Sequence, residues 1–245
     1  MDETLDTLPI GNLRLFQARN GYRYSLDPVL LADFVGTGNW KRVVDLGTGS
    51  GILVLLLAEL TAASELIGVE RQAEMAERAR RNIELNSYQE RVRICEADIR
   101  DLGAEITAGW ADLVVTNPPF RPPGGGRIAP DDERAAARHE LAGGLLDFLS
   151  MAARLLKYGG SFALIHLAER LPEIFSEMRT EGLEPKRLRM VHPRMGEGAR
   201  LVLISARKGG RPGLKVETPL YIYNDREGDD ERNYTDEVLR IYGRG

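Results

Sequence analysis

The chain has 245 residues, of which 43% are hydrophobic and 29% charged, the composition of a globular protein with enough length for one large α/β domain. Its formal net charge is −4, which argues against a protein that coats nucleic acid non-specifically, because such binding needs many Lys and Arg contacts with phosphates. No stretch approaches the roughly 20 uninterrupted apolar residues of a membrane helix, and the acidic N-terminus lacks the pattern of a signal peptide.

Predicted strands and helices alternate along the chain. Short apolar runs predict buried strands at 42–46, 66–69, 92–95, 113–116 and 162–166. Helical stretches are predicted between them at 52–60, 72–85, 145–156 and 171–178, with Gly159-Gly160 as the stop signal of the third. Two last strands, 187–191 and 201–206, are joined by the 193–198 loop without a helix, so we expect them to pair antiparallel.

This alternation predicts an α/β fold: a Rossmann-like, mostly parallel sheet with helices on both faces and one antiparallel strand at the edge. No internal boundary divides it. We expect residues 1–40 to be an N-terminal extension packed on a domain of residues 41–245.

A glycine-rich loop follows the first of these strands. Residues 43–51 read Val-Val-Asp-Leu-Gly-Thr-Gly-Ser-Gly. The three glycines are Gly47, Gly49 and Gly51, and Thr48 lies between the first two. Glycines allow a tight turn and a close approach of backbone to ligand. Dinucleotide-binding loops have the pattern GxGxxG and face a pyrophosphate, but here the third glycine comes one position early, and Asp45 would repel a phosphate. The loop therefore favours a ligand that carries an ammonium and a sulfonium.

Acidic residues end the next two strands. Glu70, followed by Arg71, can accept hydrogen bonds from ribose hydroxyls, and Asp98 can accept one from an adenine amino group, with Ile99 over the adenine face. The carboxyl ends of parallel strands meet at one edge of a sheet. Together with Asp45 and the glycine loop, these residues look like the S-adenosylmethionine site of class I methyltransferases.

The tetrad Asn117-Pro118-Pro119-Phe120 follows the fourth strand. An exocyclic amine or an amide nitrogen is a poor nucleophile because its lone pair is delocalised. The Asn117 side chain and the Pro118 carbonyl can accept both of its N–H bonds, and these bonds strengthen as positive charge develops on the nitrogen. Phe120 offers a face for the substrate ring to stack on. We therefore expect Asn117, Pro118 and Phe120 to be the catalytic residues, with Asn117 also beside the cofactor.

The order of glycine loop, two acids and tetrad resembles the class I methyltransferases that act on planar nitrogen: adenine-N6 enzymes, guanine-N2 rRNA enzymes and release-factor glutamine enzymes. Further blocks at 21–31, 135–140, 154–160, 184–189 and 221–242 resemble the bacterial tRNA1(Val) (adenine37-N6)-methyltransferase family. The resemblance implies S-adenosylmethionine as cofactor, S-adenosylhomocysteine as product, tRNA as partner, and the adenine 3′ to the anticodon as target. A Pro-Gly-rich insert at 121–131 departs from the family pattern.

For the substrate, we expect contacts from Pro119, Arg121, Arg138 and His139. Arg138 and His139 could equally lie on the surface at the N-terminus of a helix without contacting the RNA. Tyr24, Ser25 and Asp27 are candidates for a lid over the cofactor, and the basic stretch 186–215 either binds RNA or forms ordinary surface. We expect no metal and no membrane partner. The single cysteine, Cys95, cannot form an internal disulfide and fits a buried residue in a cytoplasmic enzyme. The alternatives that stay open are a glutamine protein methyltransferase, a guanine-N2 rRNA enzyme and a cofactor-binding scaffold.

Overall fold

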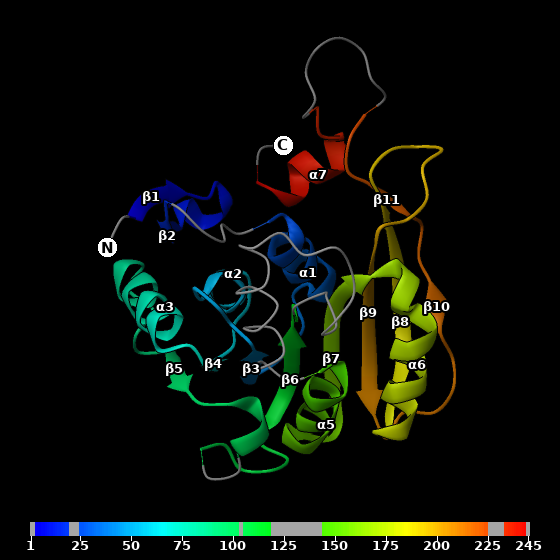
Figure 1. Ribbon diagram of the computed structural model, residues 1–245, viewed down its shortest axis with the longest axis horizontal. Helices are drawn as coiled ribbons and strands as arrows, with labels where there is room; N and C mark the ends of the chain where they lie inside the picture. The colour runs from blue at the N-terminus through cyan, green and yellow to red at the C-terminus, as the bar shows by residue number, and fades with distance from the viewer. Residues whose placement is uncertain (1–2, 20–24, 103–104, 119–143, 225–232, 244–245) are drawn as a thin grey trace, which may run out of the picture.

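A twisted sheet with helices on both faces forms the centre of the structure (Figure 1). The structure is a computed structural model, and it describes residues 3–19, 25–102, 105–118, 144–224 and 233–243. Within these residues the main sheet has nine strands, in the order β10-β8-β9-β7-β6-β3-β4-β5, with β11 also paired to β8. Their bounds are β3 Arg42–Leu46, β4 Glu65–Glu70, β5 Val92–Glu96, β6 Ala111–Thr116, β7 Leu156–Leu167, β8 Leu183–His192, β9 Leu201–Lys208, β10 Lys215–Val216 and β11 Leu220–Tyr221.

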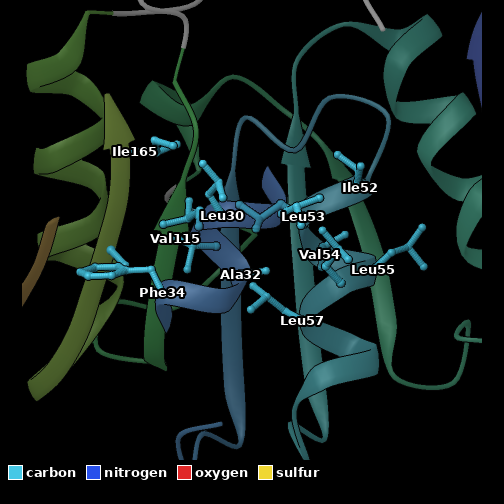
Figure 2. Close-up of a cluster of buried hydrophobic side chains, with 14 of the residues drawn as sticks. Leu30, Ala32, Phe34, Ile52, Leu53, Val54, Leu55, Leu57, Val115 and Ile165 are labelled. Atoms are coloured by element: carbon cyan, nitrogen blue, oxygen red, sulfur yellow. The ribbon is translucent and has the colours of Figure 1, made fainter. Parts of the chain in front are cut away.

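The helices cover the sheet in two layers. Their bounds are α1 Asp27–Val35, α2 Ile52–Leu60, α3 Ala73–Leu85, α5 Leu145–Leu155, α6 Leu171–Thr180 and α7 Asp236–Ile241. Side chains alternate across each strand, so Val43 faces the cluster that contains α1 and α2, and Val44 faces the cluster that contains α5 and α6. Figure 2 shows the first cluster, in which side chains of α1 and α2 meet Val115 of β6 and Ile165 of β7. None of the described helices is both long and apolar enough to cross a membrane.

The predicted fold class is confirmed, and the position of its reversed strand is corrected. β9 runs antiparallel to both β7 and β8, as expected for the last two long strands, but it lies between them, so that β8 and β10 are outside it. After β7 the chain crosses through α6 to β8, which leaves the position of one strand open between β7 and β8. The chain then turns back, and β9 occupies that position. In Figure 1 the β9 arrow points opposite to that of β6.

The end of α5 also differs from the prediction. The helix ends at Leu155, and Gly159 and Gly160 lie inside the long strand β7 instead of stopping the helix. Gly159 has a φ of +74°, and the register between β6 and β7 shifts in this region, which is the pattern of a bulge. A Cβ on Gly160 would come within 2.9 Å of Lys157 O. These two glycines therefore allow the irregular pairing of β7 with β6.

The N-terminal residues form a separate antiparallel hairpin of β1 (Glu3–Thr7) and β2 (Arg14–Ala18), which lies beside α3 (Figure 1). Leu8, Leu13 and Leu15 are buried in the same cluster as α1 and α2. Glu3 forms ion pairs with Arg78 and Arg81 of α3 at 2.9 and 2.7 Å. Apolar burial and charge pairing thus both hold this segment on the α/β domain.

Candidate active site

Three strand ends meet at the carboxyl edge of the sheet. Leu46 of β3 pairs with Val69 of β4 on one side and with Thr116 of β6 on the other. The residues that follow Leu46, Val69 and Thr116 are therefore at the same level, which brings Gly47, Glu70 and Asn117 together at this edge of the sheet. Thr116 Oγ1 donates a hydrogen bond to Leu46 O at 2.8 Å and fixes the end of β6 against the end of β3. No local pattern in the sequence indicates this role of Thr116.

The glycine loop follows a path that glycine allows. Gly47, Gly49 and Gly51 have φ values of +74°, +58° and +85°, in the region that side chains disfavour. The amides of Gly47 and Thr48 both donate to Val69 O at 2.9 Å. A Cβ on Gly47 would lie 3.2 Å from the ring of Phe148 on α5, a proximity that no pattern in the sequence predicts. The loop is thus fixed from β4 below and from α5 at its side.

Asp45 is buried beneath this loop. It is only 1% exposed, and Thr48 Oγ1 donates a hydrogen bond to its Oδ2 at 2.6 Å. Burial raises the pKa of the Asp45 carboxyl to about 7; the Thr48 hydroxyl opposes that shift, and the charge of Glu70 adds to it. A carboxyl group with a pKa near neutrality responds strongly to a nearby cation, because a positive charge favours its ionised form.

Glu70 joins the glycine loop to the end of β4. Its Oε2 accepts a hydrogen bond from Gly49 N at 3.0 Å, and its Oε1 accepts one from Gln72 N at 2.8 Å. The residue is 8% exposed. Each carboxylate oxygen can accept more than one hydrogen bond, so Glu70 keeps acceptor capacity for hydroxyl groups of a ligand.

Asp98 caps a short 3-10 helix, Ile99–Asp101, after β5. Its Oδ1 accepts from Arg100 N at 3.0 Å, and its two oxygens pair with the Arg100 guanidinium at 2.9 and 2.6 Å. This pairing lowers the pKa of Asp98, and the charge of Arg71 contributes in the same direction. Arg71 Nε is buried without a hydrogen-bond partner among the described residues. Ile99 is itself buried in the cluster that contains α5.

Only the first half of the tetrad lies within the described residues. Asn117 is half-buried and Pro118 is buried, directly after β6 and beside the glycine loop. The second half, Pro119 and Phe120, lies outside the described residues. So do the other predicted substrate contacts Arg121, Arg138 and His139, together with Tyr24 of the predicted lid. In the part of the chain that the structure describes, no three His, Cys, Asp or Glu side chains are placed to hold a metal ion.

The basic stretch 186–215 is tied into the fold by ion pairs. Arg187 pairs with Glu217 at 2.7 Å, and Arg189 pairs with Glu237 of α7 at 2.6 Å. Arg194 lies 3.6 Å from Glu197 and over the ring of Tyr223. These arginines therefore fasten the C-terminal segment to β8 and the loop that follows it.

The sheet order and the site at its carboxyl edge define a class I methyltransferase domain, and a family model described as a methyltransferase domain matches residues 39–198. Within that class, the chain belongs to the tRNA1(Val) (adenine(37)-N6)-methyltransferase family. It is 32% identical to the protein of that name from Tolumonas auensis over 192 residues, which are 77% of each chain. It is 31% identical to the one from Aeromonas salmonicida, over 78% of this chain and 79% of the relative.

Solved structures share the fold. A crystal structure described as a predicted O-methyltransferase, Atu636 from Agrobacterium tumefaciens, has a TM-score of 0.69 and 26% identity, and the match covers 89% of this chain and 96% of the other. TYW2 from P. horikoshii in complex with MeSAdo has a TM-score of 0.59 and 17% identity, over 85% of this chain and 72% of the other. The second likeness, at this low identity, concerns the fold alone.

Proposed function

We propose that this protein transfers a methyl group from S-adenosylmethionine to N6 of an adenine in tRNA, at position 37 of tRNA1(Val). The observation that carries the proposal is the register of β3, β4 and β6, which brings Asn117 and Pro118 beside the glycine loop and Glu70. The names of the related proteins support the same substrate and the same atom.

The residues around the glycine loop fit S-adenosylmethionine. The loop has no side chain at Gly47, Gly49 or Gly51 to obstruct a close approach, and Glu70 has acceptor capacity left for ribose hydroxyls. Buried Asp45 provides a negative charge that a cationic ligand would favour. We assign Thr48, Arg71, Asp98 and Ile99 to the same site, with Asp98 and Ile99 at the adenine. When bound, the cofactor supplies a methyl group on a sulfonium, which is an electrophile with a good leaving group.

The Asn117 side chain and the Pro118 carbonyl carry the chemistry on the protein's side. Both are acceptors, so together they hold the two N–H bonds of the target nitrogen and orient its lone pair. Positive charge grows on that nitrogen during transfer, and the two hydrogen bonds strengthen with it. The product is acidic enough to lose its extra proton to water, so positioning is the main contribution of these residues.

The substrate side of the site is assigned from the sequence. Phe120 and Pro119 would stack on and border the adenine, while Arg121, Arg138 and His139 would contact the RNA. An adenine next to the anticodon is in a single-stranded loop, so its extrusion costs less than the few kcal/mol of a base inside a duplex. A tRNA substrate supports a location in the cytoplasm.

The test is methyl transfer from labelled S-adenosylmethionine to total tRNA, ribosomal RNA and a release factor in parallel, followed by digestion and identification of the labelled product. We expect labelled N6-methyladenosine from tRNA and no label in ribosomal RNA or in the release factor. Label in rRNA guanine or in protein glutamine would keep the fold and the cofactor and reject the substrate. A protein that binds the cofactor and transfers no label would be a scaffold.

A further inference from the structure

Asn82 is a buried polar side chain that none of the roles above uses. It lies on α3 and is 0% exposed. Its Oδ1 accepts a hydrogen bond from Phe16 N at 2.7 Å, and its Nδ2 donates to Phe16 O at 3.3 Å and to Ser50 O at 2.9 Å. Because Phe16 N can only donate, this network fixes which way the amide points. Asn82 therefore joins the N-terminal hairpin, α3 and the glycine loop.

The peptide between Ser50 and Gly51 is held at both of its ends. Its carbonyl, Ser50 O, accepts from Asn82, and its amide, Gly51 N, donates to Thr48 O at 2.9 Å. A Cβ on Gly51 would lie 3.1 Å from the Cβ of Ala79, so α3 also limits the loop from the side. With both ends fixed, this peptide cannot rotate without breaking a hydrogen bond that is at least partly shielded from water.

Gly49, which precedes Ser50, connects the Ser50–Gly51 peptide to Glu70 at the end of β4. Gly49 N donates to Glu70 Oε2 at 3.0 Å, and a single peptide unit, Gly49–Ser50, separates that amide from the Ser50–Gly51 peptide. Gly49 has a φ of +58° and no side chain to restrict it. The geometry of the Gly49–Glu70 contact therefore depends on what holds Ser50.

We propose that Asn82 is a positioning residue for cofactor binding. By holding Ser50 O it keeps the Gly49 amide on the Glu70 carboxylate, and it couples the β1–β2 hairpin to the loop that receives the cofactor. This inference rests on the proposed function, because it takes the glycine loop as the S-adenosylmethionine site.

Asn86, the C-cap residue of α3 and four residues after Asn82, provides a matched control. Arg14 N donates to Asn86 Oδ1 at 2.9 Å, and Asn86 Nδ2 donates to Arg14 O at 2.7 Å. Asn86 therefore binds β2, the strand that Asn82 also contacts. Asn86 Nδ2 also donates to the backbone oxygen Asn82 O of α3 at 2.7 Å. Asn86→Ala thus weakens the hairpin anchor while leaving the bond to Ser50 in place.

The experiment measures the affinity for S-adenosylhomocysteine by calorimetry in the wild-type protein, Asn82→Ala, Asn82→Asp and Asn86→Ala, with the melting temperature of each. Asn82→Asp keeps an acceptor for Phe16 N and, when ionised, has no donor for Ser50 O, so it tests the same bond if the alanine variant does not fold. We expect both Asn82 variants to bind at least about fivefold more weakly, as for the loss of one buried hydrogen bond. Asn86→Ala should bind like the wild type.

Two results would overturn the inference: wild-type affinity in an Asn82 variant, or an equal loss of affinity in Asn86→Ala, which would assign the effect to the hairpin anchor. A wild-type protein that does not bind S-adenosylhomocysteine would instead count against the proposed function. At saturating S-adenosylmethionine, kcat in Asn82→Ala should stay within about twofold of the wild-type value while KM for the cofactor rises, because binding and not chemistry is affected.

Discussion

Replacing Glu70 by alanine tests the cofactor site most sharply, because this one side chain connects the loop, the strand end and the predicted ribose. Its two oxygens accept from Gly49 N and Gln72 N at 3.0 and 2.8 Å. The substitution removes both acceptors and the charge at a position that is 8% exposed. We therefore expect two separate effects, one on cofactor affinity and one on stability.

The size of each effect follows from the bonds that are lost. A hydrogen bond to a charged acceptor contributes roughly 1.5–3 kcal/mol, so losing the ribose acceptor should weaken cofactor binding by about 10- to 150-fold. An unsatisfied buried amide costs about 1–3 kcal/mol, and water reaching the space that Glu70 leaves would offset part of this cost. For a chain of this length, that corresponds to a fall of a few degrees in melting temperature.

Calorimetric titration with S-adenosylhomocysteine measures the first effect, and a thermal melt measures the second. Glu96→Ala is the matched control, because Glu96 pairs with Glu70 across β4 and β5 and its carboxylate pairs with Arg80 instead of the loop. It removes the same charge from the same edge of the sheet. Unchanged affinity in Glu70→Ala, or an equal loss in Glu96→Ala, would refute the assignment of Glu70.

Asn117→Ala should lower the rate constant of methyl transfer by on the order of 100-fold in a single-turnover assay while cofactor affinity changes little, and an equal loss of cofactor binding would contradict its role at the target nitrogen. Because the pKa of Asp45 is about 7 in the folded protein and about 4 when unfolded, the free energy of unfolding should fall as the pH rises from about 4 to about 7, and cofactor affinity should rise through about pH 7. Urea melts and calorimetric titrations at several pH values measure the two quantities, and in Asp45→Asn neither should show this pH dependence. Hydrogen bonds and ion pairs with Arg81 and Arg78 lower the pKa of Glu3 to about 2, so their stabilisation is present above about pH 4.5 and is lost as the pH falls toward 2. Acid denaturation of Glu3→Gln should be less steep over that range, and an unchanged curve would rule out this anchor.

The central part of the fold could be predicted because its signals are local. Apolar runs that end in glycine or in an acid mark the parallel strands, and their carboxyl ends meet at one edge whatever the rest of the chain does. Asp45, Glu70 and Asn117 are therefore predicted to lie in one site from the sequence, and the register of β3, β4 and β6 puts their backbone positions at the same edge of the sheet.

The remaining parts depend on contacts between distant residues. The insertion of β9 between β7 and β8 follows from the route of the chain and not from the composition of the strand. Thr116, Phe148 and Asn82 look ordinary in the sequence, because their partners Leu46, Gly47 and Ser50 lie 70, 101 and 32 residues away. Two of these contacts are also made to backbone oxygens, which no sequence pattern marks. The hairpin strands, Glu-Thr-Leu-Asp-Thr and Arg-Leu-Phe-Gln-Ala, lack the longer apolar runs of the core strands. The hairpin is held largely by α3 and the core, so no local pattern predicts it.

The most direct measurement is methyl transfer to unmodified tRNA1(Val), compared with the same transcript in which adenine 37 is replaced by guanine. We expect labelled N6-methyladenosine, up to one methyl group per tRNA, in the first transcript and no label in the second. Label that persists after the replacement, or label in any other nucleoside, would contradict this expectation.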